Sequence, residues 1–127
     1  MTRLQWALAM TGIALVPTAA RSQAAAPDSI AVAEARQRLT NDLRNFIVAQ
    51  EQHFADKVTY ARTLAQLGTL HRTTSGVTLV LLTSSGTGHS EIAIDERVPG
   101  LVCGTYVGNA PPPFGRGDEG EIVCHGP

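Results

Sequence analysis

The chain has 127 residues and a formal net charge of −1, from 10 lysines and arginines against 11 aspartates and glutamates. This length suits one domain, and the near-neutral balance excludes the strong positive field that binding to nucleic acid or to an anionic membrane needs. Hydrophobic residues make up 43% of the chain, which is enough for a packed core and argues against general disorder.

The first 24 residues have the organisation of a secretory signal. Arg3 precedes an uncharged and mainly apolar stretch at 4–16, and Ser22-Gln23-Ala24 gives a small-x-small cleavage site, with 18–20 as a second option. The apolar stretch is shorter than the ~20 residues of a membrane-spanning helix. We therefore predict a signal peptide over residues 1–24. An uncleaved membrane anchor is the alternative, and membrane contact is expected only in that case.

Cleavage after Ala24 would leave 103 residues with a net charge of −3. Export would also place Cys103 and Cys124, the only two cysteines, in an oxidising compartment such as the periplasm, the cell surface or the medium. We therefore predict a Cys103–Cys124 disulfide. By the chain-entropy model, closing a loop of this length contributes about 3 kcal/mol.

A short linker over 25–29 precedes a predicted long helix. Pro27-Asp28-Ser29 offers an N-cap, and the apolar pattern predicts a helix over Ser29–Ala55, within a domain that fills 30–127. Such a helix is about 40 Å long, so its alanine-rich start is expected to project beyond the domain. The apolar stripe has spacings of three and four, as shown by Val32, Ala35, Leu39, Leu43, Phe46, Ile47, Gln50 and Phe54.

Strands follow the helix after a short helical turn at 61–67, which is predicted to close at Gly68. One strand, apolar on both faces, is expected to be buried, the next alternates with Ile92 and Ile94 on one face, and the last is short. The predicted strands are Val77–Thr83, Ser90–Asp95, Leu101–Val107 and Glu121–Cys124. A long helix followed by about four antiparallel strands predicts an α+β roll with the sheet packed on the helix.

These residues, in this order, resemble the globular part of type IV pilins and type II secretion pseudopilins, over about residues 30–125. In that family a long helix packs on an antiparallel sheet, and a C-terminal disulfide encloses a variable surface loop. The matching segments are Asp42–Asn45, Ala49–Glu51, His53–Asp56, Thr59-Tyr60, Leu64–Gly68, Gly76–Leu79, Cys103–Gly108 and Glu121–Cys124.

The amino-terminal region departs from the family. Pilins begin with a short basic leader, a glycine cleavage point and an apolar start that carries a glutamate, whereas no acidic residue precedes Asp28 here. We therefore expect an exported, non-catalytic domain that acts through protein–protein or surface contacts, with a protein partner or by self-assembly. The alternative is a structural subunit of a pilus-like or pseudopilus-like extracellular filament. An enzyme or small-ligand binder is a third hypothesis.

No motif predicts a catalytic residue or a cofactor. The histidines lack the spacing of a zinc motif and are expected to be exposed or to cap backbone groups; they are His53, His71, His89 and His125. Asp118, Glu119 and Glu121 could bind Ca²⁺, which some pseudopilins hold in this region. The other interpretation of these carboxylates is a solvated acidic loop that keeps an edge strand from pairing.

The predicted contact surface consists of Tyr60, Phe114 and Arg116. Phe114 and Arg116 follow three consecutive prolines in the loop 108–121, and an aromatic residue on a rigid loop is a frequent protein contact. For Tyr60, a place in the core or at an interface is the favoured interpretation, whereas Phe114 is equally compatible with packing back on the sheet. Arg116-Gly117-Asp118 also matches a short adhesion tripeptide, but a tripeptide of this kind is common by chance.

The signal-peptide prediction is tested by sequencing the amino terminus of the exported protein. We expect a start at Ala25. An intact Met1 on a membrane-bound protein would contradict cleavage and support the anchor instead.

Overall fold

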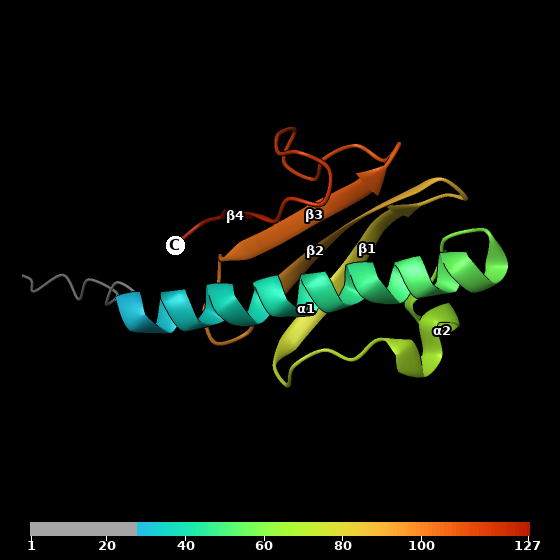
Figure 1. The fold of residues 1–127 in the computed structure, drawn as a ribbon. Helices are drawn as coiled ribbons and strands as arrows, with labels where there is room; N and C mark the ends of the chain where they lie inside the picture. Colours follow the sequence, from blue (N-terminus) through green and yellow to red (C-terminus); the bar gives the residue numbers. More distant parts are fainter. Residues whose placement is uncertain (1–27) are drawn as a thin grey trace, which may run out of the picture.

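One long helix, α1, crosses one face of a four-stranded antiparallel sheet in the computed structural model, which describes residues 28–127 (Figure 1). The strands follow chain order across the sheet, β1-β2-β3-β4. This confirms the predicted α+β class, whereas the signal peptide and the linker as far as Pro27 lie outside the described residues. The elements are α1 (Ser29–Lys57), α2 (Leu64–Leu67), a 3-10 turn (Gly68–Leu70), β1 (Val77–Ser84), β2 (Gly88–Asp95), β3 (Val102–Gly108) and β4 (Val123–His125).

The start of α1 has the predicted cap, because the Asp28 carboxylate accepts a hydrogen bond of 3.1 Å from the Ile30 amide. Ile30 is 65% exposed, but Ala35 is already buried, so only the first turn or so projects beyond the sheet. The helix ends two residues later than predicted. It closes at Val58, whose φ of 59° is unusual for a β-branched residue and whose amide donates to the Phe54 carbonyl over 2.7 Å.

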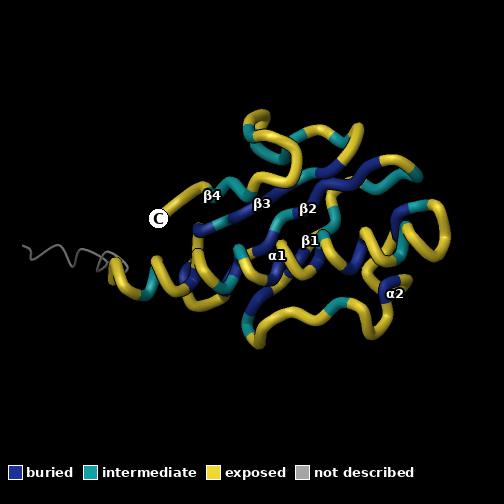
Figure 2. Tube along the Cα trace, viewed as in Figure 1, coloured by how far each residue is buried: buried dark blue, intermediate teal, exposed yellow. Residues whose placement is uncertain are grey.

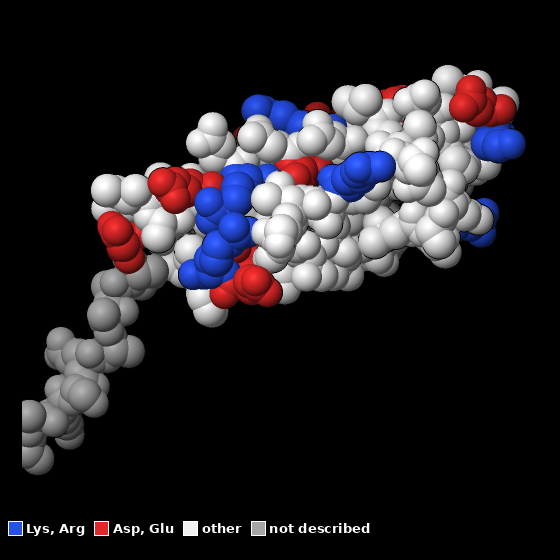
Figure 3. Space-filling view, turned by 90° about the horizontal axis from the view of Figure 1, so that it is seen from below, with Lys and Arg blue, Asp and Glu red and all other residues white. Residues whose placement is uncertain are grey.

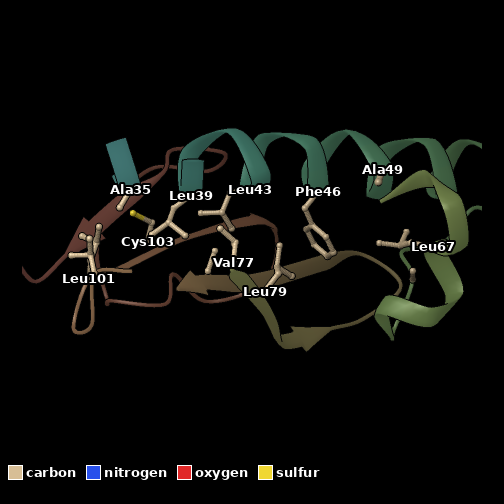
Figure 4. Close-up of a cluster of buried hydrophobic side chains, with 13 residues drawn as sticks. Ala35, Leu39, Leu43, Phe46, Ala49, Leu67, Val77, Leu79, Leu101 and Cys103 are labelled. Carbon is tan, nitrogen blue, oxygen red and sulfur yellow. The ribbon is translucent and has the colours of Figure 1, made fainter. Parts of the chain in front are cut away.

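The core lies between α1 and the inner face of the sheet, with the α1 side chains pointing at the strands (Figure 4). The buried surface runs along the sheet-facing side of α1 and through β2 and β3, while the segments before β1 and β4 are largely exposed (Figure 2). Full burial of one leucine contributes about 1.5–3 kcal/mol, so this stripe is the main source of stability. From α1 it contains Ala35, Leu39, Leu43, Phe46 and Ala49.

The first strand differs from its prediction. β1 forms one edge of the sheet, and its outer face is open, with Val80 40% and Leu82 45% exposed. The strand was expected to be buried because both of its faces are apolar, but only the face that carries Val77 and Leu79 packs against α1. The other predicted strands are present, with ends that shift by one to two residues.

The short helix α2 begins later than the predicted start at Ala61. Both backbone groups of Ala61 are bound by the buried Gln50 side chain, which donates to its carbonyl over 3.0 Å and accepts from its amide over 2.8 Å. Ala61 is therefore held in an extended segment. The helix starts only after Thr63, whose hydroxyl caps the Gln66 amide. Gly68 ends it with a φ of 54°, as predicted.

A second side chain of α1 fastens the segment that leads into β1. The buried Asp42 carboxylate accepts hydrogen bonds from the amide and the hydroxyl of Thr74, at 2.8 and 2.9 Å. Asp42 and Gln50 lie on the same side of α1 as the core stripe. The connection between helix and sheet is thus positioned by the helix itself.

An ion-pair network joins α1 to the end of β2. The buried Asp95 carboxylate lies 2.7 Å from the Nε atoms of both Arg38 and Arg97. Burial alone would raise the pKa of Asp95. The hydrogen bonds from Arg97 and Arg38 outweigh this effect and lower the pKa of Asp95 from 3.8 to about 2.

We predict that this network makes stability depend on pH in the acid range. Because the pKa of Asp95 is lower in the folded state, its contribution is complete above about pH 4 and is lost as the pH falls toward 2. Asp95→Asn should lower the free energy of unfolding at pH 7 by about 1–2 kcal/mol, after allowance for solvent screening of the part-exposed arginines. Urea unfolding at pH 7, 4 and 2.5 measures this. Exposed Asp56→Asn is the control, and an equal deficit of Asp95→Asn at pH 7 and pH 2.5 would contradict the assignment.

Candidate functional site

The loop between β3 and β4, residues 109–122, lies over the outer face of β3 (Figure 1). The Tyr106 hydroxyl donates to the Gly117 carbonyl over 3.2 Å, and the Gly120 amide donates to the Tyr106 carbonyl over 2.8 Å. Gly104 permits close approach of the loop, because a β-carbon there would lie 3.1 Å from Pro113 Cγ. The loop is therefore held against the sheet along its length.

The Cys103–Cys124 disulfide is present and closes this loop. The two cysteines lie opposite each other in the β3–β4 ladder, with Cys103 fully buried against the core. β4 has only three residues, so the covalent bond fixes a strand that backbone pairing alone would hold weakly. A disulfide of this kind forms and persists in an oxidising environment.

The structure divides the predicted contact surface. Arg116 is exposed at the tip of the loop, and Phe114 is half-buried, with its ring edge-on to His125 at a centroid distance of 6.0 Å. Tyr60 is instead a core residue with 9% exposure, whose ring packs against Phe54 and His89. The prediction that Tyr60 belongs to the contact surface is therefore wrong, and the candidate surface consists of Phe114 and Arg116.

The Tyr60 hydroxyl also makes a hydrogen bond within the protein. It donates to the Glu51 carboxylate over 2.9 Å, and burial together with this bond raises the pKa of Tyr60 to about 12. A surface hollow of about 550 Å³ borders its ring, between the end of α1 and the start of α2. The charged side chains that line this hollow are those of Lys57 and Arg62, with His53 beside them.

The acidic residues of the loop do not converge on one point. Glu119 accepts a hydrogen bond from the Gly108 amide, and Glu121 accepts one from the Asp118 amide, at 2.7 and 2.8 Å. Two of the three carboxylates thus stabilise turns of the loop. Among residues 28–127, no group of three or more histidine, cysteine, aspartate or glutamate side chains is arranged to hold a metal ion.

The inner face of β2 carries a buried polar pair, His89 and Glu91, of which only His89 was considered above as a candidate residue. His89 Nδ1 lies 2.8 Å from the Glu91 carboxylate, and both side chains are fully buried under α1. Burial raises the pKa of Glu91, whereas the bond to His89 opposes that shift. In the described part of the chain, His89 Nε2, Glu91 Oε1 and Thr105 Oγ1 have no hydrogen-bond partner.

The expectation for the histidines is therefore wrong at His89, which is a core residue. His53 Nδ1 donates a hydrogen bond to the Thr59 carbonyl over 2.8 Å, as a capping residue would, and His125 is exposed. His71 is half-buried and packs edge-on against Phe46. The useful signal was the alternation of β2, because a strand with isoleucines on one face must place His89 and Glu91 together on the other.

No protein-family model matches this sequence, and no curated protein matches it either. The resemblance to pilins and pseudopilins therefore stays a prediction. In the part of the chain that the structure describes, no helix has the length and apolar character that crossing a membrane requires.

We predict that the disulfide holds both the loop and β4. Cys103→Ala with Cys124→Ala should lower the free energy of unfolding by about 3 kcal/mol and should make the loop sensitive to proteases. Urea denaturation and limited proteolysis with mass mapping measure the two effects. The single variant Cys124→Ala, which keeps the buried thiol, separates loss of the bond from loss of core packing. A change below about 1 kcal/mol with an uncut loop would contradict this role.

Proposed function

We propose that the protein is an exported, non-catalytic, pilin-like domain that acts through protein–protein or surface contacts. The observation that carries this proposal is the loop 109–122, which presents exposed charged groups on a backbone held by a disulfide and by its own hydrogen bonds. A loop that is already ordered loses little conformational entropy when it binds, which favours recognition.

The chemistry of the loop also supports a contact role. Arg116 is exposed at its tip, and Phe114 offers part of an aromatic ring beside it. Arginine and aromatic residues are the types that most often carry binding energy in protein interfaces. The carboxylates of Asp118 and Glu119 lie close by in the chain, so the loop presents charges of both signs to a partner.

Two further observations support export and the pilin-like comparison. The disulfide suits an extracytoplasmic compartment, which we propose to be the periplasm, the cell surface or the medium. The arrangement of a long helix on a four-stranded antiparallel sheet is the one that the pilin resemblance implies. Because fold does not determine function, the contact role rests on the loop and not on the fold.

The proposal predicts a discrete partner at the tip of the loop. A photo-crosslinking amino acid at Phe114, introduced in the native host, should give one defined protein adduct or a self-adduct. Arg116→Glu should weaken that contact about tenfold or more without changing the unfolding midpoint, because the side chain is exposed. Arg44→Glu, an exposed charge reversal on α1, is the matched control.

Adduct formation that is equal in the Arg116→Glu and Arg44→Glu variants would contradict the contact role of the loop. Electron microscopy of the exported protein distinguishes a free-standing contact domain from a filament subunit. Fibres would overturn a free-standing contact domain and support a subunit of a pilus-like filament.

A further inference from the structure

β1 is an edge strand whose register with β2 is regular from Val77 to Leu81 and shifts between Leu81 and Thr83. It has eight residues, Val77–Ser84, and among residues 28–127 only β2 pairs with it. Its sequence, Val-Thr-Leu-Val-Leu-Leu-Thr-Ser, contains neither a charge nor a proline. Natural edge strands are commonly protected by lysine, proline, very short length or a β-bulge. Only the last of these is present, between Leu81 and Thr83, so the regular part of the edge over residues 77–81 stays open to pairing.

The free backbone groups of this edge can be assigned from the ladder. The Glu96 amide donates to the Gly76 carbonyl over 3.0 Å, and hydrogen-bonded positions alternate along an antiparallel pair. The backbone groups of Val77, Leu79 and Leu81 therefore point away from β2. The Val77 amide donates to the Thr74 carbonyl, so Leu79 and Leu81 supply the open donors and acceptors.

A groove runs beside this edge. It has a volume of about 550 Å³, with Leu64, His71, Arg72 and Thr73 on one side and β1 residues 77–79 on the other. The segment that leads into β1 thus forms the wall opposite the open edge. An extended chain added at Leu79 would therefore lie in this groove.

The side chains around the groove favour an extended peptide with few charges. Val80 is exposed beside the open edge, where it can contact apolar side chains of an added strand. Burial lowers the pKa of His71, although the charge of Asp42 opposes this shift, and its buried ring nitrogens have no partner among the described residues. Arg72 is the one charged residue that lines the groove.

Charged groups also lie near the groove, because Asp42 binds Thr74 and the side chains of Glu96 and Arg97 lie beside Gly76. Figure 3 views the molecule from the side that carries α2 and the segment leading to β1. Charged side chains gather toward the two ends of this face, and a broad stretch between them carries few. Among the residues that line the groove itself, Arg72 is the one charge that an acidic residue of a partner would meet.

We propose that an extended segment of a partner protein, largely apolar and carrying one acidic residue, adds to the open edge of β1 as a fifth strand. Its backbone pairs with Leu79 and Leu81, and its carboxylate pairs with Arg72. Strand addition of this kind takes affinity from main-chain hydrogen bonds and specificity from the flanking side chains. The inference rests on the proposed function and deepens it by naming the class of partner segment.

The experiment uses a synthetic peptide with the sequence of residues 90–94, Ser-Glu-Ile-Ala-Ile, and the full-length chain. This sequence already pairs with the other side of β1, is largely apolar and carries one carboxylate. Amide hydrogen exchange followed by NMR should show at least tenfold slower exchange at Leu79 and Leu81 at saturating peptide. A peptide methylated on alternate backbone nitrogens should have no effect, because it lacks the donors that face the edge.

Two variants test the assigned contacts. Arg72→Glu should weaken peptide binding about tenfold, whereas Arg44→Glu, on the exposed side of α1, should leave it unchanged. Thr78→Lys places a charge at the open edge on an exposed side chain and should abolish the protection of Leu79 and Leu81. Both variants keep the core side chains of β1.

Unchanged exchange at Leu79 and Leu81 in millimolar peptide would overturn the proposal. Slow exchange without peptide would also overturn it, and light scattering would then identify the occupant: a dimer indicates a second copy, and a monomer indicates a segment of the same chain. Failure here is distinguishable from failure of the proposed function, because the Phe114 crosslink and its loss in Arg116→Glu do not involve the groove.

Discussion

The seating of α1 on the inner face of the sheet is the interaction on which the rest of the structure depends. The stripe from Ala35 to Ala49 supplies most of the helix side of the core. On the same side of the helix, Asp42 and Gln50 bind backbone groups of the segment between α1 and β1. One helix face therefore both buries the sheet and positions the connection. The wall of the groove beside β1 depends on these hydrogen bonds, since they fix the two ends of the segment that forms it.

The inner face of β2 places polar groups under this helix, and the desolvation of these groups lowers the stability of the fold. Asp95 is compensated by two arginines, whereas Glu91 has His89 as its one hydrogen-bond partner among the described residues, and its pKa is raised by burial. These buried polar groups disfavour any other register of β2 with its neighbouring strands. A shift of one residue would turn Ile92 and Ile94 inward and expose the whole polar set, breaking the contacts that compensate the buried charges. The polar face thus specifies one alignment of β2, at a cost in stability.

The parts of the fold that follow from periodicity were predictable, and the parts that depend on which face is buried were not. The stripe of α1, the Asp28 cap and the number and order of strands are local patterns, and the structure confirms them. The strand patterns of β1 and β2 do not say which side faces α1. For that reason β1 was expected to be buried on both sides, and His89 was expected to be exposed or capping. Tyr60 and Phe114 depend in the same way on long-range packing, with Phe54, His89 and His125, that no spacing in the sequence encodes.

The two edges of the sheet differ, because the β4 edge is short and covalently fixed and the β1 edge is long and open. This asymmetry limits how the molecule can make contacts. At the β4 edge, a three-residue strand is joined covalently to its neighbour, and the loop that precedes it covers the outer face of β3. At the β1 edge, a long uncharged strand ends in free backbone groups beside a groove. The first edge is short and covalently fixed, and it presents the side chains of the loop that precedes it. The second can present backbone, because among residues 28–127 no strand other than β2 pairs with β1. A contact that needs side-chain chemistry therefore belongs to the loop, and a contact made by strand addition belongs to β1.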